Sequence, residues 1–282
     1  MGSQRRRALV VGIALWSLLV GPAFPSDAGE LSDARRSVRE SGEEDPEEKP
    51  RKRRRRDDDC EEETRFSIVL GRAFGLALTS PFWGPHVFLE DDLSDHHAIV
   101  PRPYDDAPFA RQHESRDDPN PPLFGRIQWQ GLTDFGDLSA FEGQALIETP
   151  WRLGIDTTFG RWQEDLPAGD DQLWLGDFNI VYRFAESEDI HFRSGIGMNW
   201  LNDAVGSDTG FNFTYGIDYY PRRPWVVSTT FDLGTLGEAG LFHNQTTIGL
   251  VWDRFEVFTG YEFYSIGEGD LHGWINGVRI RF

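Results

Sequence analysis

Histidine and carboxylate side chains gather in one acidic stretch of the chain, between residues 86 and 114. Imidazole and carboxylate groups are ordinary ligands of zinc and other transition metals. The histidines here do not follow a helical i, i+4 spacing and match no known metal motif. We therefore expect a solvated acidic loop and keep metal binding as the alternative. The candidate ligands are His96, His97, Asp91, Asp92 and Asp95.

Hydrolysis is a second chemistry to consider, and it needs a base, an orienting carboxylate and a nucleophile. His243 and His272 lie near corresponding ends of two alternating segments, and Asp170, Asp171 and Asp203 lie in loops at that end. No Gly-x-Ser-x-Gly motif occurs, and no nucleophile stands at a diagnostic spacing. His243 also fits an interior polar residue. We expect no catalytic residue, no enzyme activity and no cofactor.

The balance of charge excludes several classes of protein. The chain has 282 residues and a net charge of -19. Residues 1–65 carry 14 basic and 15 acidic side chains, whereas residues 66–282 carry 14 and 32. This acidity excludes a basic nucleic-acid surface as a global property. The single Cys60 excludes an internal disulfide and a Cys-only zinc site. No apolar run of 18 residues occurs, so we expect no membrane-spanning helix.

The first 65 residues predict an exported chain with an unfolded tether. Arg5, Arg6 and Arg7 precede an apolar stretch from residue 8 to 21, and Ser26-Asp27-Ala28 offers a small-x-small cleavage site. Residues 1–28 therefore have the pattern of a secretory signal peptide. Residues 29–65 contain no aromatic side chain and run in acidic and basic blocks, the basic run being 49–56. We interpret them as a disordered charged linker.

Residues 66–122 are interpreted as a helix/loop connector. The apolar stretch 66–89 fits a helix, and the alternation of Ile68, Leu70 and Leu76 fits a strand nearly as well. Residues 90–122 are rich in proline and have no sustained periodicity. Long structureless spans are uncommon inside a compact domain, so we expect this one to pack against or under the domain that follows.

From residue 123 to 282 the hydrophobic pattern has a period of two, which predicts β-strands. Ten segments follow one another: 123–131, 138–148, 151–162, 172–184, 190–201, 210–220, 225–234, 241–252, 255–266 and 271–282. Ordinary strands have about five or six residues, whereas strands of this greater length suit a membrane. A soluble sandwich also alternates, with its apolar face in the core, and remains the alternative.

The two faces of these segments differ. One is apolar and carries aromatic side chains near the segment ends, as a bilayer interface selects. We expect these interfacial aromatics to be Trp151, Trp174, Trp200, Trp225, Trp252, Trp274 and Phe282. The other face is polar or small and would line a lumen. Its expected lumen charges include Arg183, Arg193, Glu256, Glu262, Arg279 and Arg281.

The end of the chain resembles the C-terminal recognition strand of bacterial outer-membrane β-barrels, a class that includes the small OmpA-like barrels. Phe282 closes the chain with Ile280 and Val278 on its face, while Asn276 departs from the pattern. The resemblance implies an all-β, antiparallel up-and-down transmembrane barrel of about ten strands in the outer membrane. It also implies contact with outer-membrane lipids and insertion by the barrel assembly machinery. An even strand number would place both barrel ends, and the N-terminal extension, in the periplasm.

The expected function follows from the lumen and the loops. A barrel of about ten strands encloses little space, and a final hairpin centred near 267–269 would set Glu256 opposite Arg281 and position 262 opposite 275. We expect ion pairs to plug the lumen, with a structural or envelope role or narrow transport. The acidic outward loops would attract divalent cations or cationic ligands, or simply confer solubility. The alternatives are a secreted soluble all-β binding protein and an outer-membrane enzyme that modifies lipid or peptide.

Overall fold

A computed structural model describes residues 29–39, 85 and 123–282, except 150, 168 and 188. Within these residues the chain forms helix α2 (Glu30–Arg39) and ten strands. The strands are β1 (Phe124–Thr133), β2 (Leu138–Glu148), β3 (Leu153–Glu164), β4 (Asp171–Glu186), β5 (Ile190–Asn202), β6 (Ser207–Arg222), β7 (Trp225–Leu236), β8 (Ala239–Trp252), β9 (Phe255–Ile266) and β10 (Gly269–Arg281).

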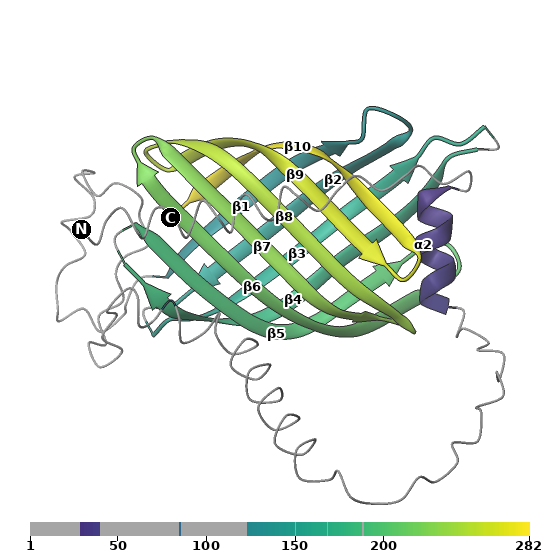
Figure 1. The fold of residues 1–282 in the computed structure, drawn as a ribbon, viewed down its shortest axis with the longest axis horizontal. Coiled ribbons are helices and arrows are strands. Elements are labelled where there is room, and N and C mark those ends of the chain that lie inside the picture. The colour runs from purple at the N-terminus through teal and green to yellow at the C-terminus, as the bar shows by residue number, and fades with distance from the viewer. Residues whose placement is uncertain (1–28, 40–84, 86–122, 150, 168, 188) are drawn as a thin grey trace, which may run out of the picture.

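The strands close into an antiparallel barrel in which every strand pairs with its neighbours in sequence (Figure 1). The closing pair joins β1 to β10, from Arg126 opposite Arg281 to Thr133 opposite Trp274. Closure removes both sheet edges, so every strand has partners on both sides. The prediction of a ten-stranded up-and-down barrel is confirmed, and the predicted bounds of each strand lie within three residues of the observed ones.

The apolar face of the strands points outward. Ile180, Ile196 and Val257 are 58%, 61% and 64% exposed, whereas Arg183 and Glu262 on the opposite face are 1% and 0% exposed. A soluble protein would bury the apolar face, because exposing so many large apolar side chains to water is unfavourable. Lipid is the solvent that suits this exterior. The soluble all-β alternative is therefore wrong.

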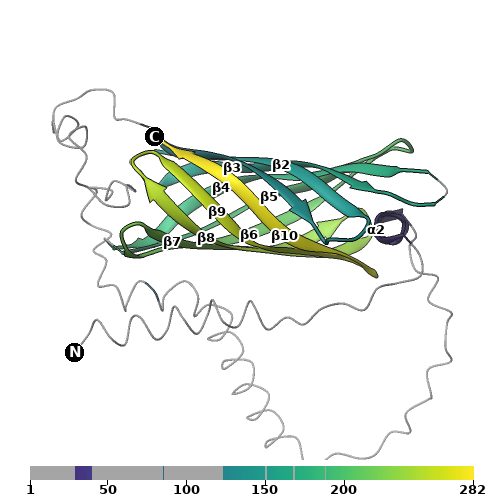
Figure 2. The same cartoon turned by 90° about the horizontal axis from the view of Figure 1, so that it is seen from above.

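The two ends of the barrel differ. The start of β1 and the end of β10 lie at one end, which we call the terminal end, and α2 lies at the other, which we call the helix end (Figures 1 and 2). Five connections lie at the helix end, at 134–137, 165–170, 203–206, 237–238 and 267–268. Inward side chains near this end are apolar, in contrast to the predicted polar face. They include Leu132, Leu138, Trp162, Leu173, Leu201, Leu236, Leu241, Ile266, Leu271 and Ile275.

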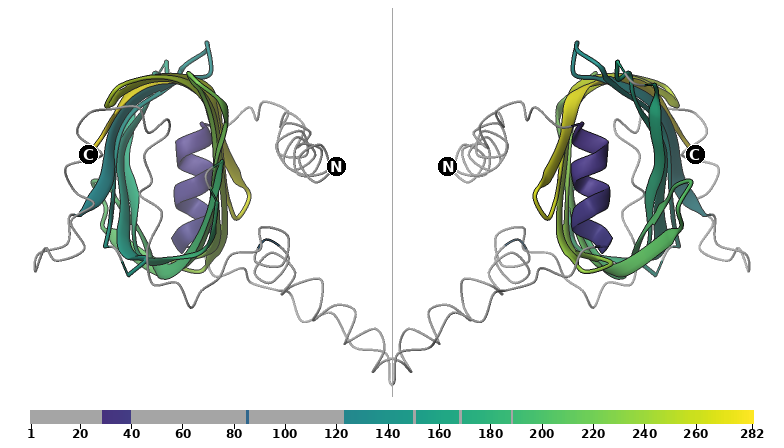
Figure 3. Two further views of the ribbon diagram at one scale, coloured as in Figure 1. Left: turned by 90° about the vertical axis from the view of Figure 1, so that its left-hand side faces the viewer. Right: turned by 90° about the vertical axis from the view of Figure 1, so that its right-hand side faces the viewer.

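Helix α2 lies across the mouth at the helix end (Figure 3). Leu31, Ala34 and Val38 follow an i, i+3, i+7 spacing and are at most 1% exposed, packed on the apolar mouth. The prediction that residues 29–65 are unfolded is therefore wrong for Glu30–Arg39. The segment lacks enough apolar surface to fold alone, but the barrel mouth supplies the missing partner. Residues 40–65, the predicted signal peptide and nearly all of the predicted connector lie outside the described residues.

Helix α2 lies at the end of the barrel opposite the strand termini. That residues 29–39 lie in the periplasm stays a prediction. No helix among the described residues has the length and apolar character needed to cross a membrane.

The last hairpin has a tighter turn than predicted. Ile266 pairs with Gly269, leaving a two-residue turn at Gly267-Glu268. The register therefore sets Glu256 opposite Arg279, and Glu262 opposite Gly273. The predicted pairings of 256 with 281 and of 262 with 275 are both wrong by two residues. A shift of two keeps each side chain on its face, since the side-chain period of a strand is two.

Candidate functional site

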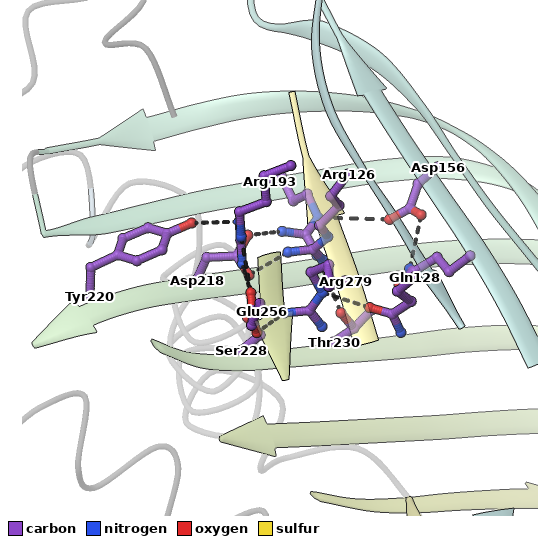
Figure 4. Close-up of polar contacts among 12 residues, drawn as sticks. Arg126, Gln128, Asp156, Arg193, Asp218, Tyr220, Ser228, Thr230, Glu256 and Arg279 are labelled. Carbon is purple, nitrogen blue, oxygen red and sulfur yellow. Dashed lines mark hydrogen bonds and ion pairs between the residues drawn. The ribbon is translucent and has the colours of Figure 1, made fainter. Parts of the chain in front are cut away.

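The lumen near the terminal end is crossed by a buried network of arginines and carboxylates, which we call the terminal network (Figure 4). Glu256 is shared between two arginines of β10: its Oε1 accepts a hydrogen bond from Arg279 Nη1 at 2.6 Å, and its Oε2 accepts one from Arg281 Nη2 at 2.6 Å. Arg279 also donates to Gln128 and lies over the Phe258 ring, 4.7 Å from its centroid. Each group of this cluster is thus held by more than one partner.

A second carboxylate links two further strands. Asp218 on β6 accepts hydrogen bonds from Arg126 Nη1 at 2.7 Å and from Arg193 Nη1 at 2.5 Å. Arg193 also lies 3.7 Å from Asp156 and donates to Thr230. Because these residues come from β1, β3, β5, β6 and β7, the network ties opposite walls of the barrel together.

A third group lies beside them on β2 and β4. Arg183 donates from Nε to Glu148 at 3.2 Å and from Nη1 to Glu186 at 2.7 Å. Glu186 also pairs with Arg152 at 3.1 Å. Burying a charge is costly unless it is paired and hydrogen-bonded, and these side chains meet that condition through one another.

The middle of the lumen is held by amides and carboxylates. Gln130 donates to Glu142 at 2.6 Å and to Glu262 at 2.7 Å. His243 Nδ1 lies 2.6 Å from Asp232, its Nε2 lies 2.9 Å from Glu262, and its ring stacks on Tyr264 with 3.9 Å between centroids. These contacts connect β1 with β2 and β9, and β8 with β7 and β9.

The histidines do not form the hydrolytic site considered above. His243 has an orienting Asp232, but its second nitrogen faces the carboxylate of Glu262 rather than a nucleophile. His272 shares the outward face with Trp274, and its Nδ1 lies 2.9 Å from the Tyr261 hydroxyl. Since the two rings lie on opposite faces of the wall, they cannot act on one substrate.

Loop and strand-end carboxylates of the helix end hold α2. Glu164 accepts hydrogen bonds from the backbone N–H of Glu30 at 2.9 Å and of Leu31 at 3.1 Å, placing an anion at the helix N-terminus. At the other end of α2, Arg39 donates to Asp203 at 2.9 and 3.1 Å and to Asp208 at 3.0 Å. The acidic loops were expected to attract a cationic ligand. In this structure their carboxylates pair with an arginine of α2.

Two carboxyl groups at the helix end, those of Glu30 and Asp203, have shifted pKa values. Burial raises the pKa of the Glu30 carboxyl to about 7, and the carboxylates of Asp134, Glu164 and Asp270 add to the effect. Burial also opposes ionisation of Asp203, but hydrogen bonds from Arg39 and from two backbone N–H groups outweigh it and lower the pKa of Asp203 to about 2. The docked helix therefore favours a neutral Glu30 beside an ionised Asp203.

The aromatic side chains expected at the interface lie on the exterior. Trp151, Trp225 and Trp252 flank strands at the terminal end, as does Phe282, whereas Trp174 and Trp200 lie nearer the helix end. Trp274 lies in the middle of β10 rather than at its end. Trp200 is half-buried and the other six are exposed. The aromatic side chains thus lie on the exterior toward both ends of the barrel, except for Trp274.

Two cavities lie inside the lumen. Their volumes are about 20 and 10 Å³, and they lie in the terminal network and in the middle of the lumen. No group of three or more His, Cys, Asp or Glu side chains in the described part of the chain is arranged to hold a metal ion. The histidine-rich stretch proposed as a metal site, at residues 91–97, lies outside that part.

The feature that sequence reasoning missed is the closure of the mouth. Two signals pointed to it. Leu31, Ala34 and Val38 form a helical stripe, and the inward positions of several strands change from polar to apolar toward the helix end. Neither signal identifies the other as its partner, since about 90 residues separate them along the chain.

Comparison with known proteins adds a few distant matches. No protein-family model and no curated protein matches the chain. The Yersinia pestis outer membrane protein Ail in a nanodisc is 12% identical, with coverage of 57% of this chain and 100% of its own, at a TM-score of 0.35. Neisserial surface protein A is 14% identical, with coverage of 57% and 96% at a TM-score of 0.28. The N-terminal β-barrel domain of Pseudomonas aeruginosa OprF is 13% identical, with coverage of 56% and 97% at a TM-score of 0.26.

With identities and TM-scores this low, these matches add nothing to the evidence of the barrel itself. That evidence is twofold: ten strands close without an edge, and the apolar side chains face outward while the charged ones face inward. Such a wall is stable only in a bilayer. The chain is a ten-stranded transmembrane β-barrel.

Proposed function

We propose that the protein is a closed outer-membrane barrel with a structural role in the cell envelope, rather than an open diffusion channel. The lumen is obstructed at two levels: α2 covers the mouth at the helix end, and ion pairs between opposite walls fill the terminal half. A barrel of eight strands is just filled by its side chains, whereas open porins have about sixteen. A barrel of ten strands is close in size to the filled eight-stranded barrels, and its large inward arginines occupy much of the remaining lumen.

One observation carries this proposal. The cavity in the terminal network has a volume of about 20 Å³, and a single water molecule needs about 10–15 Å³. A hydrated ion or a small metabolite requires a continuous path that is many times larger. The arginines around the cavity are cross-linked to carboxylates of other strands, so a path would require several ion pairs to separate at once.

The test is electrical. The full-length protein reconstituted in planar bilayers should show no stable conductance, although it migrates as a folded, heat-modifiable band. A triple variant, Glu256→Ala with Arg279→Ala and Arg281→Ala, removes one cross-link of the terminal network. It lowers the net charge of that network by one. It should produce leak currents, which also proves that the protein inserts. A large, stable single-channel conductance from the unaltered protein would refute the closed barrel.

Narrow transport is a second candidate, and the way α2 is held favours it. The helix is attached by apolar packing on the mouth, by ion pairs at the rim and by a backbone hydrogen bond from Glu238 N–H to the Val38 carbonyl. None of these contacts belongs to the pairing of the strands, so the helix is removable without breaking the barrel wall. In that case a variant that releases α2 should acquire a small conductance with the terminal network intact. If release leaves the bilayer silent, the closed structural role is supported instead.

We also propose that the barrel assembly machinery recognises β10 and that the exterior contacts outer-membrane lipids. Trp274 and Val278 lie exposed on the outer face of β10, with polar Asn276 between them, and exposed Phe282 directly follows the strand. Replacing Phe282 with Ser should lower the amount of folded protein in the outer membrane. Refolding of the same variant into lipid vesicles without the machinery should be nearly normal. Equal defects in both assays would instead indicate a stability effect of Phe282.

A further inference from the structure

The cavity at the terminal end has an unusual lining. It has a volume of about 20 Å³ and is surrounded by four arginines, one histidine and one tyrosine, together with two carboxylates. These side chains are Arg126, Arg183, Arg193, Arg281, His191, Tyr220, Glu148 and Asp218. Four cations and two anions around one small cavity make it strongly positive.

The positive potential is local to the cavity. Each arginine stays charged under all ordinary conditions. Three further carboxylates, Asp156, Glu186 and Glu256, pair with Arg193, Arg183 and Arg281, but none of the three lines the cavity. The side chains that line it therefore carry two more positive charges than negative ones, which favours a bound anion.

Two polar atoms at the cavity are also unsatisfied. Arg126 uses Nη1 to bind Asp218, but its buried Nε has no hydrogen-bond partner among the described residues, and neither has the buried Nε2 of His191. The His191 ring is held edge-on to Tyr220, with 5.3 Å between centroids. Leaving buried donors unpaired costs free energy, so both atoms call for an acceptor in the cavity.

Size limits what that acceptor is. About 20 Å³ admits a particle of roughly the size of a water molecule. A phosphate, a lipid headgroup or a carboxylate of any length is too large. Water would fill the volume but would bring no negative charge to this positive lining. A monatomic halide satisfies the size, the charge and the need for an acceptor together.

We propose that this cavity binds one chloride ion, which acts as a structural counterion between Arg126 and His191. The neutral His191 ring donates from Nε2, and Arg126 donates from Nε. The ion offsets the excess of positive charge that lines the cavity and so stabilises the folded barrel. This site depends neither on the closure of the mouth by α2 nor on the absence of conductance.

Thermal unfolding of the full-length protein in detergent or nanodiscs tests the site. Chloride, bromide or gluconate is compared at constant ionic strength, because gluconate is too large for the cavity. Chloride and bromide should raise the melting temperature in a saturable way, as a ligand bound to the folded state alone does. His191→Phe keeps the ring but removes the donor, and should weaken the apparent chloride affinity at least about tenfold, the effect of losing one hydrogen bond to a charged group.

Thr247→Val is the matched control, since it removes a buried lumen hydroxyl that has no hydrogen-bond partner among the described residues and lies outside the cavity. It should keep the chloride dependence of the unaltered protein. Crystals of the unaltered protein grown with bromide provide a direct readout, an anomalous peak between Arg126 and His191, even if His191→Phe does not fold. Three results would overturn the proposal: no bromide peak, equal melting temperatures in chloride and gluconate, or an undiminished chloride effect in His191→Phe.

Discussion

Arg39 and Asp203 form a bidentate pair that anchors the C-terminal end of α2 to the barrel. Arg39 Nη1 donates to Asp203 Oδ2 at 3.1 Å and Nη2 donates to Oδ1 at 2.9 Å. Arg35 adds an ion pair to the same carboxylate at 2.5 Å. The Asp203 side chain is almost fully buried beneath the two arginines. The pair is therefore a better-shielded contact than an ordinary surface salt bridge.

Loss of this pair should loosen the helix without unfolding the barrel. Arg39→Gln removes a charge-assisted bidentate contact, and we expect the docking of α2 to weaken by about 1–2 kcal/mol. Amide hydrogens of residues 30–39 should then exchange roughly 5–30 times faster, as measured by mass spectrometry. Arg36→Gln is the control, because Arg36 is half-exposed and forms an ion pair with Asp33 of the same helix. Equal exchange in the two variants would show that Asp203 does not anchor α2.

Docking of α2 should depend on pH through Glu30. The pKa of Glu30 is raised to about 7 in the docked state, so the docked state binds a proton that the released helix loses near its ordinary pKa. Docking should therefore weaken as the pH rises from about 4.5 to 7 and stay weaker above that. Exchange of residues 30–39 should be faster at pH 8 than at pH 5.5 after correction for intrinsic rates. Glu30→Gln should abolish that difference, and its persistence would exclude Glu30 as the cause.

The opposite end of the pH range tests Asp203. Its pKa is lowered to about 2, so its contribution to docking is present above its ordinary pKa and is lost as the pH falls through about 4 to 2. Helix α2 should thus be best protected between about pH 4 and 6. Asp203→Asn should remove the loss of protection below pH 4. A variant that still loses it there would point to other carboxylates of the mouth.

A glycine at the rim allows the helix to be displaced sterically. A Cβ on Gly269 would lie 2.4 Å from the backbone nitrogen of Ala34, whereas a Cβ on Gly240 at the same end of β8 would meet nothing within 4 Å. Gly269→Val should expel α2, giving near-complete exchange of residues 30–39 within the dead time, while the barrel stays heat-modifiable. Gly240→Val should behave like the unaltered protein. Protection of α2 in Gly269→Val would contradict the docking seen here.

The lipid-facing exterior is tested on β5. Ile196 is 61% exposed in the middle of the strand, and Ile196→Arg should cost about 2–4 kcal/mol of folding free energy in a bilayer. Ile217 is less suitable, because it is buried among Phe184, Tyr215 and Tyr219 on the same exterior. Val205→Arg in the loop after β5 is the control and should be nearly neutral. Urea unfolding in vesicles measures both, and equal stability would argue against a lipid-facing Ile196.

Glu256 should be essential to the terminal network. It lies between Arg279 and Arg281, with all three groups at most 10% exposed at the side chain. Glu256→Gln leaves two buried arginines short of one negative charge, so we expect a loss of about 3–5 kcal/mol. Sequence reasoning placed its pair with Arg281 at a solvated rim, where a salt bridge contributes little, and missed its burial. Glu238→Gln in an exposed turn should change stability by less than about 0.5 kcal/mol in the same assay.

The barrel was predictable because its signal is local. In Leu138–Glu148 and Phe255–Ile266 the period-two pattern matches the observed strand bounds without error. The match is close because successive residues of a membrane strand face lipid and lumen in turn. The register within the last hairpin was harder to predict from the sequence, because Gly267-Glu268-Gly269 suits a turn of two residues as well as a turn of three. Pairing with β1 and β9 on both sides settles which turn forms.

The sequence by itself therefore determined the strands, their inward and outward faces and the class of protein, because each follows from the chemistry of neighbouring residues. Only the tertiary structure decided that Leu31, Ala34 and Val38 close the mouth, that Arg39 meets Asp203, and that Arg126 and His191 face one cavity. These contacts join residues far apart in the chain, such as the 164 positions between Arg39 and Asp203. An isolated helix of ten residues is marginal in water, and a lone arginine or aspartate predicts no partner. Each acquires its role only when barrel closure brings its partner to the same end of the lumen.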